Sequence, residues 1–445
     1  MVQSGKVKML KQLSVVAVGT AIIVFGGNRA SGPISAEMAK PLLKATEPAE
    51  FCLMPDAFEY AQSGAAQTRS GPRGPLAVPA DWPGKDVLGG DVPPTRIVAD
   101  PYPTFDGLAV DPENGVVVMS DENRSGLLIY DRAGGSQSKA ITEPKRHIIG
   151  PRAELGFIAG VTLDPARREA WVVNNDGGGI TVFSYDQHGD AAPVRKLEVP
   201  HQSWGLSLDP TKNEVAVTSQ QYQGITIYAS TATGTARPLR TIRGEGTLLA
   251  DPHGVFLDGV NNEVFAANHG NWTEMRSYAD DSVMLPGEYK AGRFEQPSIR
   301  IFPASANGDV APIRSIQGKQ TQLAWPMGLD VSRDRNEVAV ANYGSNSILI
   351  YSRTGSGDVA PIRVLGGERT GIIGPIAVGF DHKNKELWVA NYGDHTAVVF
   401  DIDAAGNVAP KRIIRNAPAG TPTTGFTNAS AAAYDSKRDE LLVPN

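Results

Sequence analysis

A tandem repeat of about 50 residues restricts the possible folds of this chain more than any other feature. An apolar segment that ends in aspartate recurs seven times along the sequence. These aspartates are Asp111, Asp164, Asp209, Asp258, Asp330, Asp381 and Asp435, and their spacings are 53, 45, 49, 72, 51 and 54 residues. A repeat of this length with several short strands is typical of β-propeller blades, whereas a β-helix has a much shorter period.

Each repeat contains four short segments that are rich in β-branched and aromatic residues. A Pro-x-Arg element such as Pro312-Ile-Arg314 precedes the glycine-rich segment that ends in aspartate, and segments such as 336–342 and 347–351 follow it. Turn-forming residues separate the four segments, which indicates strands. Because proline lacks the N–H that a sheet interior requires, we expect Pro-x-Arg to start the outermost strand and the glycine-rich segment to be the innermost. The sequence therefore predicts an all-β fold, a seven-bladed β-propeller of four-stranded blades over residues 93–445.

The ends of the repeat array predict how the ring closes. The seventh repeat stops after its second strand, at 441–445. We expect an N-terminal strand at residues 94–98 to complete this blade as its outermost strand, with residues 57–60 as its third. Such an interlock would remove the open sheet edge.

The N-terminus predicts export. Lys6, Lys8 and Lys11 precede an apolar run over residues 13–25. This pattern fits a secretory signal, and the run is short for a membrane-spanning helix of about 20 residues. We therefore expect residues 1–36 to be a signal peptide or an uncleaved N-terminal anchor, and the chain to be periplasmic or extracellular. Residues 37–92, rich in Ala, Pro and Gly, are expected to form an extension before the propeller.

Composition excludes several classes of protein. The single cysteine, Cys52, excludes an internal disulfide, a thiolate zinc site, a c-type haem and an iron–sulfur cluster. The net charge of −6, from 42 basic and 48 acidic residues, argues against nucleic-acid binding. No serine-hydrolase, metalloprotease, phosphate-loop or dinucleotide motif is present. We expect a monomer that contacts a membrane only through an uncleaved N-terminal segment.

The repeat resembles the NHL and YVTN-type β-propeller superfamily. The resemblance rests on Gly-x-x-x-Asp, Val-Ala-Asn and Ile-x-Tyr recurring in that order over about residues 93–445. That superfamily covers secreted bacterial repeat proteins, streptogramin B lyase and lactonase-type enzymes. The resemblance implies the fold but no single function, because unrelated activities share the scaffold.

The fourth repeat departs most from the others and is the candidate site. Its inner strand begins Asp251-Pro-His253, its second strand ends at His269, and about 20 surplus residues give an insert at 269–297. Neutral imidazole and carboxylate oxygen both suit Zn, Mn or Fe, so His253, His269 and Glu122 are candidate ligands of a divalent metal. In streptogramin B lyase-like propellers a histidine acts as a base beside a magnesium ion held by acid residues. The resemblance thus makes His253 the candidate catalytic base, although it could equally form a structural hydrogen bond to a neighbouring loop.

Aromatic residues are expected around the same mouth of the propeller. The candidate ligand-binding residues are Trp204, Trp325, Tyr343, Tyr392 and, in the insert, Trp272. They could stack on a ligand or simply fill the mouth. The recurring Asn-Glu pairs that start second strands, such as Asn336-Glu337, are interpreted as turn formers and solvated charge.

Two functions remain open at the level of sequence. The first is an exported propeller that acts as a protein- or ligand-binding scaffold in the cell envelope. The alternative is a metal-assisted lyase or lactonase-type hydrolase with its site around His253 and His269. An enzyme requires both histidines within metal-bridging reach of a carboxylate in a deep mouth, whereas a scaffold predicts histidines that point apart and a mouth filled by side chains. A redox partner is disfavoured because no cofactor-attachment motif exists.

Overall fold

The computed structural model describes residues 102–175, 178–220, 222–272, 293–421, 423, 433–435, 437 and 440–442. The chain divides into two compact units, residues 36–425 and residues 1–35 together with 426–445. The predicted signal segment, the extension and the strands expected at 57–60 and 94–98 lie outside the described residues. Within the described part of the chain, no helix has the length and apolar character needed to cross a membrane.

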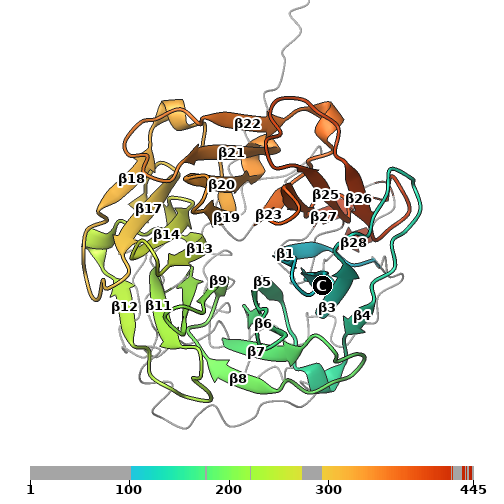
Figure 1. The fold of residues 1–445 in the computed structure, drawn as a ribbon, viewed down its shortest axis with the longest axis horizontal. Coiled ribbons are helices and arrows are strands. Elements are labelled where there is room, and N and C mark those ends of the chain that lie inside the picture. The colour runs from blue at the N-terminus through green and yellow to red at the C-terminus, as the bar shows by residue number, and fades with distance from the viewer. Residues whose placement is uncertain are drawn as a thin grey trace, which may run out of the picture. The chain divides into compact units, whose positions relative to one another are not determined.

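The larger unit contains six four-stranded antiparallel sheets, which we number as blades 1 to 6 in chain order (Figure 1). From the innermost strand outward, blade 1 has β1 (Phe105–Asp111), β2 (Val116–Asp121), β3 (Gly126–Asp131) and β4 (Arg146–Ile148), and blade 2 has β5 (Ile158–Asp164), β6 (Glu169–Asn174), β7 (Gly179–Ser184) and β8 (Arg195–Glu198). Blade 3 has β9 (Ser203–Asp209), β10 (Glu214–Ser219), β11 (Gly224–Ala229) and β12 (Arg240–Arg243), and blade 4 has β13 (Pro252–Asp258), β14 (Glu263–Asn268), β17 (Ser298–Pro303) and β18 (Arg314–Gln317). Blade 5 has β19 (Pro326–Ser332), β20 (Glu337–Asn342), β21 (Ser347–Ser352) and β22 (Arg363–Gly366), and blade 6 has β23 (Pro375–Asp381), β24 (Glu386–Asn391), β25 (Thr396–Asp401) and β26 (Arg412–Arg415).

Short 3₁₀ helices lie in the connections. They are η1 (Pro151–Ala153), η2 (Glu245–Thr247), η3 (Lys319–Thr321) and η5 (Glu368–Thr370) between an outermost strand and the next innermost strand, and η4 (Tyr343–Ser345) between β20 and β21.

The ring closes with six blades, so the prediction of seven was wrong. The inner strands contact one another in the order β1, β5, β9, β13, β19 and β23, and β23 contacts β1 in turn. The seventh repeat forms β27 (Ala433–Asp435), which pairs with β28 (Glu440–Leu442) in a two-stranded sheet of the other unit. Counting aspartate-ended segments overestimated the blades, because among the described residues β27 belongs to a two-stranded sheet, whereas each blade has four strands.

The seam between blades 6 and 1 is formed by side chains and backbone of those two blades. Arg132 lies 3.2 Å from the Asp381 carboxylate and 2.9 Å from that of Glu386. Ser136 forms an antiparallel bridge with Ile413. Closure by an N-terminal strand is therefore not shown, and these contacts replace it in the described residues.

The other five junctions between neighbouring blades share a backbone bridge of another kind at the outer rim. In each, a residue of the outermost strand forms a parallel bridge with a glycine beyond the third strand of the next blade. The pairs are Ile148 with Gly189, Leu197 with Gly234, Ile242 with Gly308, Ile316 with Gly357, and Leu365 with Gly406.

The glycines of the innermost strands allow these strands to crowd together. A Cβ atom on Gly160 would lie 2.5 Å from the carbonyl oxygen of Trp204, and one on Gly254 would lie 2.6 Å from that of Met327. Real Cβ atoms do not approach backbone oxygen so closely, hence glycine is required here. The predicted positions of the glycine-rich segment and of the Pro-x-Arg strand are both confirmed by the strand order of the sheets.

One repeat position was misassigned. Ser332, rather than Asp330, pairs with Glu337 at the end of the inner strand, as Asp381 pairs with Glu386 in blade 6. The spacing explains this, because Ser332 follows Gly328 by four residues, as Asp164 follows Gly160. The Asp330 carboxylate instead accepts hydrogen bonds from the backbone N–H groups of Val331 and Phe380.

The arginines of Pro-x-Arg bind the glutamates that start the second strands. In blade 3, Arg240 donates two hydrogen bonds to the Glu214 carboxylate, 2.9 and 2.6 Å long. The equivalent pairs are Arg195 with Glu169, Arg314 with Glu263, Arg363 with Glu337 and Arg412 with Glu386. The interpretation of these glutamates as solvated charge was wrong. The outermost strand of each of these blades places its arginine beside the glutamate that starts the second strand, and the two side chains pair.

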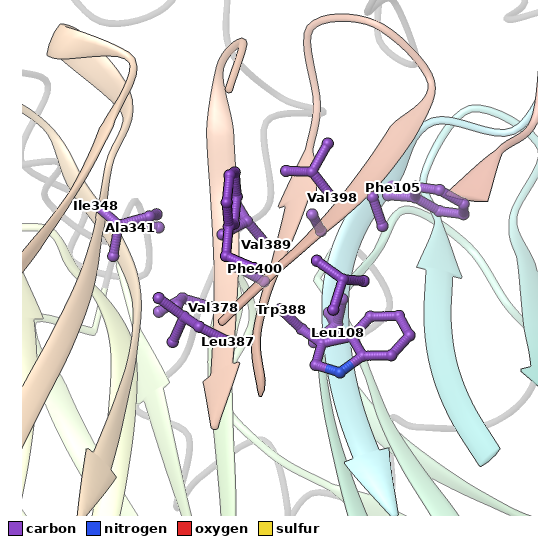
Figure 2. Packing of buried hydrophobic residues seen from close by; sticks show 14 of the residues in the cluster. Phe105, Leu108, Ala341, Ile348, Val378, Leu387, Trp388, Val389, Val398 and Phe400 are labelled. Carbon is purple, nitrogen blue, oxygen red and sulfur yellow. The ribbon is translucent and has the colours of Figure 1, made fainter. Parts of the chain in front are cut away.

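Apolar clusters fill the interfaces between blades. The largest ties blades 5, 6 and 1 together and includes Phe105, Leu108, Ile348, Trp388 and Phe400 (Figure 2). Burial of such side chains stabilises a fold by about 1.5–3 kcal/mol each. The rigid ring fixes the positions of the loops that carry the candidate site.

Candidate functional site

The mouth of the propeller is the face on which inner strands begin and second strands end. Two side-chain positions per blade define it. The position before the inner-strand glycine, or before Ala377 in blade 6, holds Asp106, Ala159, Trp204, His253, Met327 and Ile376. The position after the second strand holds Glu122, Asn175, Gln220, His269, Tyr343 and Tyr392. In blade 4 the paired residues Pro252 and Asn268 directly precede the two positions, and the His253 and His269 rings at those positions lie 3.6 Å apart.

The two histidines of blade 4 lie side by side and are buried. The ring of His253, on β13, stacks on that of His269, which follows β14, with centroids 3.6 Å apart and an angle of 17° between the planes. His253 is 3% exposed and His269 is 6% exposed. Buried imidazoles need polar partners, which the neighbouring blades supply.

Asp251 is the carboxylate of this cluster. One of its oxygens lies 3.2 Å from Nδ1 of His269, and the other accepts a 3.0 Å hydrogen bond from the Gln220 amide. The same Gln220 nitrogen lies 3.1 Å from Nε2 of His253, and Nε2 of His269 lies 3.0 Å from Sδ of Met327. Residues of blades 3, 4 and 5 therefore meet in one network.

The protonation states in this network follow from burial. Burial, reinforced by His269, lowers the pKa of His253 to about 3, against the opposing effect of Asp251. Burial alone would raise the pKa of Asp251, but His253, His269 and the Gln220 hydrogen bond outweigh it and lower the value to about 2. At pH 7 His253 is therefore neutral and Asp251 is ionised.

Asp251, His253 and His269 could hold a metal ion. One candidate ligand atom from each lies within 4.8 Å of the others. A metal ion binds in the plane of an imidazole, at about 2.0–2.1 Å for zinc. The planes of two rings stacked at 17° and 3.6 Å apart do not meet within bonding distance of either ring, so both cannot bind one ion as they lie. Asp251 and one histidine could do so directly, and the second histidine could join only after its ring rotated.

Glu122, the third candidate metal ligand, lies elsewhere. It follows β2 in blade 1, where the Tyr392 hydroxyl donates a 3.4 Å hydrogen bond to its carboxylate. The described metal-ligand cluster contains Asp251 in its place.

A row of rings crosses the mouth over blades 2 to 5, and we call it the aromatic row. It consists of Phe157, Trp204, His253, His269, Trp325 and Tyr343. Successive centroids are 6.1, 4.8, 3.6, 5.8 and 6.3 Å apart. Trp325 is 47% exposed, which makes it the accessible member of the row at blade 5.

Trp204 spans the mouth. This half-buried side chain packs against the cluster between blades 2 and 3 and also against the cluster formed by blades 5, 6 and 1. A mouth filled by side chains is what the scaffold hypothesis predicted. The stacked histidines do not point apart, as that hypothesis expected, and they are not arranged to bind one metal ion together, as the enzyme hypothesis required.

The insert of blade 4 starts and ends as a two-stranded ribbon. β15 (Asn271–Trp272) pairs with β16 (Arg293–Phe294), and residues 273–292 lie outside the described part. The side chain of Trp272 also lies outside it. A hollow of about 200 Å³ lined by Gln296, Pro297, Gly318, Lys319, Gln322 and Leu323 shares no residue with the histidine cluster.

Sequence reasoning placed Gln220 at the mouth but assigned no role to Asp106, Asp251 or Met327. For Asp106 a signal existed, because the equivalent residue in the other five blades is apolar, aromatic or histidine. Asp106 is 3% exposed, and neither of its carboxylate oxygens has a hydrogen-bond partner among the described residues. Burial, followed by the charge of Glu122, raises the pKa of Asp106 well above its ordinary value.

Comparison with known proteins adds little to this picture. No protein-family model matches the chain, and no curated protein sequence matches it. Among solved structures, a hydrazine synthase of Kuenenia stuttgartiensis is 12% identical, with a TM-score of 0.47 over 78% of this chain and 97% of that chain. That similarity is too low to assign a family or a function. The β-propeller is established by the strands and blade contacts of this chain itself, and membership of the NHL and YVTN superfamily stays a prediction.

Proposed function

We propose that this chain is an exported β-propeller that binds a ligand at its mouth and acts as a binding scaffold in the cell envelope. The observation that carries this proposal is Trp325, which lies half exposed at the mouth with a backbone φ of +50°. The lysines and apolar run at the N-terminus support export.

The conformation of Trp325 is one that a tryptophan disfavours. The equivalent residues Phe157, Gln202, Asp251 and Gly374 also have positive φ, so the turn into the inner strand imposes this geometry. Gly374 shows that the turn itself needs no side chain. A bulky residue held at positive φ costs about 1–3 kcal/mol, and such strain concentrates at functional sites.

The surroundings indicate the kind of ligand. Trp325 lies between His269 and Tyr343 in the aromatic row. Its ring centroid is 5.8 Å from that of His269 and 6.3 Å from that of Tyr343. A ligand with a flat or apolar ring face could stack on Trp325, because tryptophan offers a large rigid contact area at low entropy cost.

A substitution at Trp325 tests the proposal without endangering the fold. Trp325→Gly removes the ring and relieves the positive φ, whereas Ile362→Ala changes an exposed side chain on the outermost region of blade 5 and serves as the control. Compounds that raise the melting temperature in a library of aromatic acids, amino acids and sugars would be titrated calorimetrically. We expect affinity to fall at least about tenfold in Trp325→Gly and to be unchanged in Ile362→Ala. Equal affinity in all three proteins would overturn the proposal.

A metal-assisted lyase or lactonase-type hydrolase is the second candidate. The close approach of Asp251, His253 and His269 favours it. Its test is the metal content of the purified protein, compared with a His253→Gln, His269→Gln double variant. Stoichiometric metal in the wild type that is lost in the variant would support the enzyme, and a lactone and lyase substrate screen would follow.

A further inference from the structure

We propose that Asp106 and Glu122 bind a primary ammonium group, supplied by the ligand at the mouth. The inference deepens the proposed function by naming a chemical group that the mouth recognises. It concerns blade 1, whereas the aromatic row occupies blades 2 to 5.

Asp106 and Glu122 occupy the positions in blade 1 that His253 and His269 occupy in blade 4. In blade 4 the two side chains meet in van der Waals contact. In a closed ring of six blades, blades 1 and 4 are opposite one another. The mouth therefore has an acidic side and an imidazole side.

The carboxyl group of Asp106 makes no hydrogen bond in the described residues that would stabilise the propeller. It is 3% exposed, and neither oxygen has a hydrogen-bond partner among the described residues. Ionisation of a buried carboxyl group without a partner costs several kcal/mol and a second carboxylate nearby adds repulsion, which is why the pKa of Asp106 is raised. A cation that pairs with both groups would relieve both costs. Ala159 and Ile376 at the equivalent position show that the fold accepts apolar side chains there.

The neighbours of the two acids favour an ammonium group over a divalent metal ion. Tyr392 contributes a half-buried ring and a hydroxyl 3.4 Å from the Glu122 carboxylate. Aromatic faces attract organic cations, whereas calcium requires six to eight oxygen ligands. A primary ammonium carries three N–H donors, which match the two oxygens of Asp106 and one of Glu122. This recognition involves no covalent step, and the ammonium group stays intact.

The test uses simple amines on the full-length protein. n-Butylamine and an acetyl-lysine amide would each be titrated at constant ionic strength, with tetramethylammonium and calcium chloride as probes that lack N–H donors. We expect both amines to bind and tetramethylammonium and calcium to bind at least about tenfold more weakly. A stronger response to the lysine amide would point to a protein ligand, and a stronger response to butylamine to a free amine.

Two isosteric variants keep the test independent of folding. Asp106→Asn and Glu122→Gln preserve shape and remove charge, and each should weaken amine binding about tenfold or more. Binding that is unchanged in both variants, or calcium binding that exceeds amine binding, would overturn the inference. Ile362→Ala, an exposed side chain outside the mouth, is the control and should leave butylamine binding unchanged.

Binding measured in the Trp325→Gly variant separates this inference from the proposed function. If amines fail to bind but another ligand depends on Trp325, the inference is wrong and the binding function stands. If amine binding depends on Asp106 while no ligand depends on Trp325, the acidic side of the mouth is a binding site and the aromatic row is not.

Discussion

The imidazole of His253 lies flat against that of His269, with ring centroids 3.6 Å apart. Burial and this neighbour both penalise a proton on His253, and its pKa is lowered to about 3. The unfolded chain leaves the same residue near its ordinary pKa of about 6.5. Folding and protonation of His253 therefore oppose one another.

This opposition predicts a loss of stability in acid. Above pH 6.5 neither state protonates His253, whereas between pH 6.5 and 3 the unfolded chain binds a proton that the folded chain does not. The free energy of unfolding should thus fall by up to about 1.4 kcal/mol per pH unit in that window. His253→Gln cannot titrate and should have a shallower slope in urea unfolding measured from pH 7 to 4.5. Parallel slopes for the two proteins would contradict the prediction, and the contribution of His147, whose pKa burial lowers to about 4, is common to both.

Gly160→Ala should destabilise the junction between blades 2 and 3. The added Cβ would lie 2.5 Å from the Trp204 carbonyl oxygen and 3.1 Å from the Leu206 nitrogen, so the inner strands must separate. We expect a loss of about 1–3 kcal/mol in the free energy of unfolding. Gly156→Ala is the matched control, because a Cβ there meets nothing within 4 Å. Thermal unfolding of both variants would decide, and equal melting temperatures would show that the inner strands are less crowded than described.

The arginine–glutamate pairs predict a difference between blades. Arg412 binds Glu386 at 2.6 Å and lies over the Trp388 ring, whereas Arg146 in blade 1 faces Val116 at the glutamate position and pairs at 3.4 Å with the exposed Asp186. Arg412→Met should therefore cost about 1–3 kcal/mol, because it removes the shortest of the ion pairs of the buried Glu386 carboxylate and leaves it only Arg132 and Lys411. Arg146→Met should cost under about 1 kcal/mol. Chemical unfolding of the two variants measures both values, and a larger loss at Arg146 would refute this account.

Ring closure by blades 1 and 6 predicts that a shorter chain folds. A fragment of residues 102–421 contains the twenty-four strands of the six blades and the contacts of the seam. We expect a single cooperative thermal transition by circular dichroism. A fragment of residues 102–374 lacks blade 6 and exposes the flanks of blades 5 and 1, so it should unfold non-cooperatively or aggregate. Failure of the longer fragment would mean that residues outside 102–421 take part in closure.

Local strand signals in the sequence predicted four-stranded blades correctly, but the predicted number of blades was wrong. Glycine crowding and the missing N–H of proline depend on residues within one strand, so they identified the innermost and outermost strands. Blade number depends on which segments pair across the ring. The segment ending at Asp435 carries the same local pattern, but in the described residues it forms a two-stranded sheet. The shift from Asp330 to Ser332 has the same origin, because an aspartate near the expected spacing obscured the register set by Gly328.

The candidate site was likewise predicted in part, where the signal lay within one blade, and missed where it depended on contacts between blades. The histidines were identified because they interrupt a repeat, and the structure adds Asp251 and Gln220, which reach them from a turn and from the next blade. Glu122 was predicted to share a metal site with the histidines, because the distance between blades 1 and 4 cannot be obtained from the sequence. Asp106 interrupts the repeat as clearly as His253 does. A single acidic residue in an apolar strand did not indicate a site, because the sequence does not show that its side chain is buried.

The seam between blades 1 and 6 also sets an order of events in time. Arg412 bonds to the backbone of Arg132 across 280 positions of the chain. At about 5–20 residues per second, the ribosome needs roughly 15 to 60 s to produce that stretch. Throughout that delay Phe105 and Leu108 of blade 1 lack the blade 6 residues, such as Val378 and Phe380, that join their cluster in the closed ring. The ring is sealed last, by the blade that is synthesised last.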